Sequence, residues 1–270
     1  MKPFIKWVGG KTQLLQKVLD KFPTEINNYH EPFMGGGSVF LGVLSSPNIT
    51  VKGTIYASDA NPHLVALYRQ VQDDPEALIR ELAVLCRDLT EERYYVVRSD
   101  FNQDPTPARF LYLNKTCFRG LYREGPNGFN VPFGHNKAPG IYDADNLREI
   151  SRLIKDVVFT CQSFQQSLER VVDSRDFVYL DPPYAPENAA SFVSYTKSGF
   201  GKDAHELLFN MTRSLPCPFL MSNSNVALVR EAFPDPQFTT EIVLARRAIN
   251  SKDPSAQTNE VLIQSSSLVK

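Results

Sequence analysis

The residues best suited to chemistry form a tetrad, Asp181-Pro182-Pro183-Tyr184. The apolar run at 177–180 directly before it is typical of a buried strand, and open α/β sheets bind ligands at the carboxyl ends of their strands. Proline restricts the backbone and has no N–H, so the carbonyl oxygens of Pro182 and Pro183 are predicted to be free to accept from a substrate amino group. Asp181 offers a further acceptor and Tyr184 a stacking face. The alternative is a rigid turn without a chemical role.

A glycine-rich segment nearer the N-terminus is suited to close approach by a ligand, because glycine tolerates tight turns and a helix start follows. The segment reads Glu31-Pro32-Phe33-Met34-Gly35-Gly36-Gly37-Ser38-Val39-Phe40. Asp59 ends the next strand pattern 22 residues after Gly37, a spacing typical of a carboxylate that binds the ribose of an adenosine-containing cofactor. The same features fit NAD and many cofactor-free folds, although Phe40 replaces the third glycine of a dinucleotide fingerprint.

The segment Gly9-Gly10-Lys11-Thr12 is similar to a phosphate-binding P-loop but departs from it. Ile5 stands where the first glycine of that motif belongs, and no strand pattern precedes it. Lys11 also begins a predicted helix, the unfavourable end for a cation in the field of the helix dipole. Lys11 is therefore predicted to have an anionic partner rather than to be solvated.

These segments lie within alternating helix and strand patterns, as in a doubly wound α/β sheet. Helices are predicted at 11–22, ended by Pro23, and at 38–44. Strands are predicted at 55–58, 157–161, 177–180, 219–222, 242–244 and 261–263. Residues 62–154 differ and predict an inserted module, with helices at 75–88, 91–99 and 106–113 and a Gly/Pro/Asn-rich stretch at 119–140 that is too long for an ordinary connection.

The composition is that of a globular chain of 270 residues with 42% hydrophobic residues. No apolar run reaches the length of a membrane span and no signal-type core follows Met1, so an intracellular, non-secreted protein is expected. The spacing of the four cysteines and four histidines predicts no metal site. Net charge is −1, yet residues 109–137 hold five bases and one acid, which predicts one face that meets phosphate.

Four of these segments, in this order, resemble the Dam-type (D12 class) family of adenine-specific DNA methyltransferases. They are residues 4–11, 31–40, 113–134 and 181–184, and the resemblance extends from Phe4 to about Ile263. It implies an α/β fold, a Rossmann-like S-adenosylmethionine-dependent methyltransferase sheet with an inserted, mainly helical target-recognition domain. The catalytic domain is expected at 1–61 and 155–270 and the recognition domain at 62–154.

The resemblance also implies roles for individual residues. S-adenosylmethionine is expected to be bound by Trp7, Lys11, Phe33, Gly35, Gly37, Asp59, Ser163, Phe164 and Asp181. DNA contacts are expected from Lys115, Phe118, Arg119, Leu121, Arg123, His135 and Lys137. Phe118 would wedge into the duplex, Leu121 contact a base and Arg123 read a guanine. Two residues depart from the family, since Phe118 stands where several members have Tyr and Arg119 where Asn is usual, and these departures concern sequence specificity.

The implied reaction is methyl transfer from S-adenosylmethionine to the exocyclic N6 of an adenine that has left the base stack, with S-adenosylhomocysteine as the product. The implied partner is double-stranded DNA with a short palindromic site, GATC, read by a monomer that uses no metal and no membrane. Two alternatives stay open. One is a methyltransferase for RNA or another planar amine, and the other is a non-catalytic DNA-binding regulator with the same fold.

Overall fold

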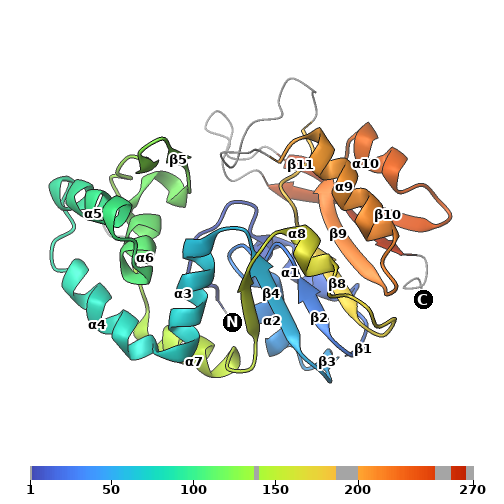
Figure 1. Cartoon of the computed structure of the whole chain (residues 1–270), viewed down its shortest axis with the longest axis horizontal. Coiled ribbons are helices and arrows are strands. Elements are labelled where there is room, and N and C mark those ends of the chain that lie inside the picture. The colour runs from blue at the N-terminus through green and yellow to red at the C-terminus, as the bar shows by residue number, and fades with distance from the viewer. Residues whose placement is uncertain (1, 137–139, 187–199, 247–256, 266–270) are drawn as a thin grey trace.

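A seven-stranded sheet forms the centre of the molecule (Figure 1), as seen in a computed structural model that describes residues 2–136, 140–186, 200–246 and 257–265. The strand order is β10-β11-β9-β8-β2-β4-β7. Pairing is parallel from β7 through β4, β2 and β8 to β9, whereas β11 lies antiparallel between β9 and β10. The strands are β2 (Tyr29–Glu31), β4 (Ile55–Asp59), β7 (Val158–Cys161), β8 (Phe177–Leu180), β9 (Phe219–Ser224), β10 (Phe238–Arg246) and β11 (Gln257–Ser265).

Strand β8 shows why the central strands are continuously apolar. Phe177 and Tyr179 point into a core with helices α1 (Leu15–Leu19) and α2 (Ser38–Ser45). Val178 and Leu180 point the other way, into a second core with α8 (Phe164–Leu168), α9 (Lys202–Arg213) and α10 (Ala227–Ala232). A parallel strand covered on both faces has no solvated side, so all four residues are buried. The predicted α/β class with a Rossmann-like sheet is confirmed.

Strands β2 and β8 define the place where a ligand can enter. They are parallel neighbours, but the chain leaves β2 toward β4 on one side and leaves β8 toward β9 on the other. Diverging connections open a crevice at the carboxyl ends of such a strand pair. The glycine-rich turn after Glu31 and the tetrad after Leu180 therefore meet at the same edge of the sheet.

A helical region occupies one end of the molecule, where α4, α5 and α6 lie together and a short hairpin lies beside α5 (Figure 1). Three of its helices begin with proline in the first turn, and the side chains of Asn61, Asp74 and Thr106 cap them by accepting backbone N–H groups. The elements are α3 (Pro62–Asp73), α4 (Pro75–Leu85), α5 (Glu91–Gln103), α6 (Pro107–Thr116), η2 (Phe118–Gly120), β5 (Glu124–Gly125), β6 (Gly128–Phe129) and α7 (Ala144–Leu153).

Helix α3 joins this region to the sheet. Its Arg69 side chain donates to the carbonyl of Phe159 in β7, and its Tyr68 hydroxyl donates to the carbonyl of Gly36, 2.9 Å away. The same helix packs against α6 and α7. The domain boundaries at residues 62 and 154 stay a prediction. Helix α3 contacts both the central sheet and the helical region.

The predicted helix at 11–22 is wrong as a single element. The structure has a 3-10 turn, η1 (Lys11–Gln13), followed by the five-residue α1. Gly10 has no side chain to cap a helix, and the Lys11 N–H is bonded to the Ser38 hydroxyl at 3.1 Å. Tertiary contacts therefore override the apolar spacing that favoured a longer helix.

Several elements were not predicted, among them the central strand β2, the helices α3, α7 and α9, and the short parallel pair β1 (Glu25–Ile26) and β3 (Thr50–Val51). With three residues, β2 is too short for a periodic signal. The strand predicted at 242–244 extends over nine residues as β10. Within the described ranges, no helix is long and apolar enough to cross a membrane.

Candidate active site

The carboxylate of Asp181 is held by a buried lysine. The Nζ of Lys11 lies 2.7 Å from Oδ1 and 2.8 Å from Oδ2 of Asp181, and it donates to the Gly9 carbonyl at 2.9 Å. The Lys11 side chain is 4% exposed and that of Asp181 18%. The anionic partner predicted for Lys11 is thus Asp181 in this structure. The three N–H donors of the ammonium group are matched by these three acceptor atoms.

Acidic groups crowd this edge of the sheet. Burial raises the pKa of Asp181 even though the Lys11 ammonium acts to lower it. Glu31, at the end of β2, is fully buried and accepts from the Tyr29 hydroxyl at 2.6 Å. Burial is the main cause that raises the pKa of Glu31 well above its ordinary value, and the negative charge of Asp181 raises it further. A cation placed here would stabilise the ionised forms of these carboxyl groups.

Tyr184 and the residue after it are fastened to the neighbouring strands. The Tyr184 hydroxyl donates to Oε2 of Glu260 in β11 at 2.7 Å, and the ring has the Lys11 Nζ 5.0 Å from its centre. The Ala185 N–H donates to Oδ1 of Asn223 at 3.1 Å, and the Ser224 hydroxyl donates to the Ala185 carbonyl. The orientation of the Tyr184 ring is therefore set by protein contacts.

The two proline carbonyls of the tetrad differ. The Pro183 carbonyl lies 3.0 Å from Nε2 of His205, so the prediction that both carbonyls are free is wrong for Pro183. Pro183 is half-buried, whereas the His205 side chain of α9 that faces its carbonyl is fully buried. A carbonyl oxygen only accepts, so this contact is a hydrogen bond when Nε2 of His205 carries a proton. Among the described residues, no donor reaches the Pro182 carbonyl. Pro182 is therefore left as the backbone acceptor of the tetrad.

The glycine-rich turn requires glycine where it meets Trp7 and Tyr68. Gly35 and Gly37 have φ values of 47° and 71°. A Cβ on Gly35 would lie 2.9 Å from the Trp7 ring, and one on Gly37 would lie 2.3 Å from the Tyr68 hydroxyl oxygen. The Gly35 N–H donates to Oδ2 of Asp59 at 3.1 Å, so Asp59 supports the turn from the end of β4. Burial raises the pKa of Asp59.

Three aromatic rings meet beside this turn. The ring centres of Phe33 and Phe164 are 5.7 Å apart with a 26° angle between planes, and Phe200 lies 5.9 Å from Phe33 and 5.7 Å from Phe164. Ser163 caps α8 in a reciprocal pair with Gln166. The structure thus brings Phe33 and Phe164 together from distant parts of the chain, and sequence reasoning missed Phe200.

The segment predicted to read DNA is exposed. Phe118 is 44% exposed, and the Arg119 guanidinium lies 5.2 Å from its ring centre. Arg119 itself has φ 58°, a left-handed conformation that is uncommon for a non-glycine residue. Leu121 is half-buried beside these residues.

Arg123 is bound along one edge of its guanidinium group. Its Nε donates to Oδ1 of Asn130 at 2.6 Å, and its Nη2 donates to the Asn130 carbonyl at 3.3 Å. The edge formed by Nη1 and Nη2 is not the one that Asn130 engages. That edge has the fork geometry that can bind two acceptors of a guanine.

Basic side chains crowd around Lys115. Lys115 lies in the last turn of α6, and burial together with the charges of Lys6 and Lys2 lowers its pKa to about 8. Nδ1 of the exposed His135 lies 3.9 Å from Oε2 of Glu91. Lys137, also predicted to contact DNA, lies outside the described residues. Sequence reasoning missed Lys2 and Lys6 because they lie more than 100 positions before Lys115.

Trp7 and Asn114 connect the exposed segment at 118–123 to the glycine-rich turn. The Trp7 ring stacks on Tyr122 with centres 5.9 Å apart and 27° between planes. The Asn114 side chain accepts from the Lys6 N–H at 3.0 Å and donates to the Lys6 carbonyl at 2.7 Å. The N-terminal segment therefore lies between the two predicted binding regions.

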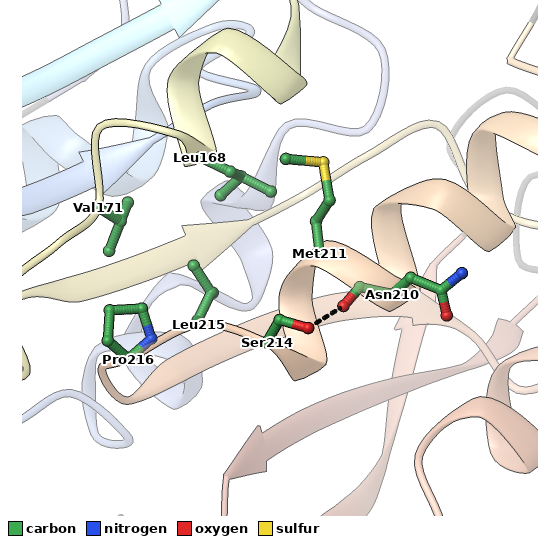
Figure 2. A pocket seen from close by; sticks show the side chains of 7 residues that line it. All are labelled: Leu168, Val171, Asn210, Met211, Ser214, Leu215 and Pro216. Carbon is green, nitrogen blue, oxygen red and sulfur yellow. Dashed lines mark hydrogen bonds between the residues drawn. The ribbon is translucent and has the colours of Figure 1, made fainter.

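Other features of the molecule lie apart from this site. A hollow of about 330 Å³ lies between α8 and the end of α9. Figure 2 shows the side chains that line it, among them Leu168, Met211 and Leu215. It lies toward the amino ends of β8 and β9, opposite the edge that carries Asp181. The part of the chain that the structure describes contains no group of three His, Cys, Asp or Glu side chains able to hold a metal ion. The four cysteines are free thiols.

Some missed residues left a signal in the sequence. Asn223 belongs to a polar run, residues 222–225, that directly follows an apolar strand pattern, and Glu260 is a lone acid beside the apolar run 261–263. Polar groups at strand ends are candidates for a site. His205 has no such signal, because its role depends on a contact with a different element.

A largely parallel sheet, an antiparallel pair at one edge, a glycine turn after β2 and an acidic tetrad after β8 together define a Rossmann-like methyltransferase. The family of D12 class N6 adenine-specific DNA methyltransferases matches residues 7–249, and the chain belongs to this family. As the resemblance predicted, the protein is a DNA adenine-specific methyltransferase.

Curated relatives match along nearly their full length. The chain is 40% identical to the type II methyltransferase M.MjaIII of Methanocaldococcus jannaschii, over 93% of this chain and 94% of that protein. It is 35% identical to the DNA adenine methylase of Escherichia coli K12, over 93% and 90% of the two chains. It is 36% identical to the type II methyltransferase M.CviBI of Paramecium bursaria Chlorella virus NC1A, over 86% of each.

Proposed function

We propose that the protein transfers a methyl group from S-adenosylmethionine to N6 of an adenine flipped out of a short palindromic DNA site, GATC. One observation carries the proposal. The Asp181 carboxylate, paired with Lys11, stands next to the ring of Tyr184, which Glu260 holds, and next to the Pro182 carbonyl, which no donor among the described residues reaches. Two acceptors beside an aromatic face match a planar base with an exocyclic amino group.

The residues of the site act by positioning. S-adenosylmethionine, when bound, supplies an electrophilic methyl group on a sulfonium. Asp181 and the Pro182 carbonyl accept the two N–H groups of adenine N6 and so direct its lone pair away from the ring. Stacking on Tyr184 returns roughly 1–3 kcal/mol of the cost of flipping the base. Orientation in a site whose acceptors are already in place supplies much of the rate.

The residues near the turn fit this cofactor. Asp59 lies where it can accept from ribose hydroxyls, and the rings of Phe33 and Phe164 suit an adenine. The crowded carboxyl groups of Glu31 and Asp181 suit the positive sulfonium. Lys11 was assigned to the cofactor carboxylate, but its three donors already contact Asp181 and Gly9, so that role requires an exchange of partners.

The exposed segment supports duplex DNA as the substrate. Phe118 is available to wedge between bases, and Arg123 has an edge that Asn130 does not engage and that can bind guanine. Lys115, His135 and Lys137 are assigned to phosphate. We further propose that the protein acts as a monomer. The names of two relatives, both type II methyltransferases, support a place in restriction-modification. Family membership favours this enzyme over an RNA methyltransferase or a non-catalytic regulator.

Methylation of random-sequence DNA tests the proposal. The full chain is incubated with S-adenosylmethionine and a random-sequence duplex library, and N6-methyladenine is located by sequencing. We expect methylation centred on GATC and none with Asp181→Ala. An excess of structured RNA should not compete. Methylated adenines in sites without GATC would disprove the specificity alone, whereas absence of methylated adenine would disprove the reaction.

A further inference from the structure

We propose that His205 is a positioning residue that fixes the active-site turn through the Pro183 carbonyl, so that Pro182 alone presents a backbone acceptor to the substrate. The inference rests on the proposed function, since it concerns the acceptors for the adenine amino group. His205 lies in the first turn of α9 and is 0% exposed. Nothing in the sequence around it predicts a link to the tetrad 22 positions earlier.

The imidazole of His205 faces two carbonyl groups. Its Nε2 lies 3.0 Å from the Pro183 oxygen, and its Nδ1 lies 2.9 Å from the Gly201 oxygen. A carbonyl oxygen only accepts, so the bond to Pro183 requires a proton on Nε2. A neutral ring with that proton donates to Pro183 alone, whereas a doubly protonated ring donates to both. A neutral ring with its proton on Nδ1 would instead donate to Gly201 alone. The proposal therefore assigns a proton to Nε2, which makes the Pro183 carbonyl an acceptor for His205 rather than for the substrate.

The conformation of the tetrad depends on contacts from other elements, because its proline pair cannot form backbone hydrogen bonds as donors. Pro182 and Pro183 have no N–H, so neither can close a turn with a backbone hydrogen bond of its own. Contacts from other elements fasten the remaining parts, through Lys11 on Asp181 and Glu260 on Tyr184. Among the described residues, His205 is the donor that acts on the proline pair.

The surroundings of His205 fix its ring plane. Phe200 packs edge-on with centres 4.7 Å apart and 84° between planes, and Phe209 lies 5.9 Å away at 64°. A polar ring within an aromatic cluster is stable when its nitrogens are hydrogen-bonded. The cluster therefore keeps Nε2 directed at the Pro183 carbonyl.

Two variants separate this donor role from simple packing. His205→Leu keeps most of the volume without a donor, whereas His205→Gln retains an amide N–H that can reach Pro183. We expect the leucine variant to lose about 10- to 100-fold in single-turnover methylation, the scale for a misplacement near 1 Å, with DNA and S-adenosylmethionine affinities within about threefold of wild type. The glutamine variant should recover most of the rate.

Thr212→Val provides the matched control. Thr212 is on the same helix and equally buried, but its hydroxyl has no hydrogen-bond partner among the described residues. The control should keep the wild-type rate. A folded His205→Leu protein with a rate within twofold of wild type would overturn the inference, and so would a folded His205→Gln protein as slow as the leucine variant.

Nitrogen-15 NMR of the histidine rings in the intact wild-type chain gives a second readout that needs no variant to fold. We expect a proton on Nε2 of His205 at neutral pH. An Nε2 without a proton would overturn the inference directly. A wild-type protein that fails to methylate adenine would instead disprove the proposed function, and the NMR result would still decide whether His205 donates to Pro183.

Discussion

The tetrad at 181–184, proposed to be catalytic, and the segment at 118–123, proposed to read DNA and called the reading segment below, are built in opposite ways. In the tetrad, Asp181, Pro183 and Tyr184 each contact a side chain from another element. In the reading segment, Phe118 is 44% exposed and Arg123 keeps one edge of its guanidinium clear of Asn130. The tetrad is therefore held mainly by contacts within the protein, whereas the reading segment presents exposed groups that a substrate can contact.

The difference follows from what each region has to do. Stabilising a transition state requires acceptors that do not reorganise during the reaction, which favours a fastened turn. Reading a sequence requires side chains that reach base edges and phosphates, which favours exposure. Changes in the tetrad should therefore alter the rate of methyl transfer, and changes in the reading segment should alter which DNA is bound. The Trp7–Tyr122 stack connects the reading segment to the glycine-rich turn beside the tetrad.

The largest effect is expected at Asp181. Asp181→Ala removes the carboxylate acceptor and leaves the buried Lys11 ammonium without its ion pair. We expect single-turnover methylation to fall by at least about 100-fold, the scale of losing one preorganised polar contact at a transition state. Adding Lys11→Met should recover thermal stability but not activity. Turnover within tenfold of wild type, with normal cofactor binding, would contradict the assigned role.

Changes at the proposed cofactor site should weaken cofactor binding without changing DNA affinity. Asp59→Ala removes the acceptor of the Gly35 N–H and the proposed ribose ligand. We expect S-adenosylmethionine affinity to fall by about 10- to 150-fold, the range for a hydrogen bond to a charged group, with unchanged DNA affinity. Titration calorimetry measures both, and Lys11→Ala should also weaken the cofactor. Unchanged cofactor affinity in both variants would place the pocket elsewhere.

The reading segment should show a change in specificity rather than in rate. Arg123→Ala is expected to relax the preference for one guanine by about 5- to 150-fold, the value of one bidentate contact. Asn130→Ala should give a smaller loss at the same base, because it only orients Arg123. Lys137→Ala, assigned to phosphate, should weaken all sequences alike and reduce salt dependence. An unchanged base preference with Arg123→Ala would refute this assignment.

The smallest expected effect is the uptake of a proton by Lys115 when the protein binds DNA. The pKa of Lys115 is lowered to about 8, and a phosphate beside it would raise that pKa. DNA binding should then take up a proton, and affinity should fall by up to about tenfold from pH 7 to pH 9. The stability of the free protein should change with pH in the opposite direction. Above about pH 8 the unfolded chain binds more protons at Lys115 than the folded chain does, so the free energy of unfolding rises with pH. Calorimetry in two buffers measures the uptake, and Lys115→Arg should abolish it.

The sequence by itself determined the class of the protein and predicted a chemical role for the tetrad. The proline pair after an apolar strand, the glycine-rich turn and the 22-residue spacing from Gly37 to Asp59 are local patterns in the sequence. In the structure the strand is buried and the turn lies against Asp59, as these patterns indicate. The same local reasoning was wrong about the helix at 11–22 and about the free carbonyl of Pro183.

Only the tertiary structure decided which groups touch. Lys11 and Asp181 are 170 positions apart, Tyr184 and Glu260 are 76 apart, and both pairs meet because the strand order β9-β8-β2 and the insertion of β11 place their elements at one edge. A strand pattern specifies that a segment is extended and buried, but not which strand lies beside it. The partners of the catalytic groups were therefore set by sheet order, which no local spacing encodes.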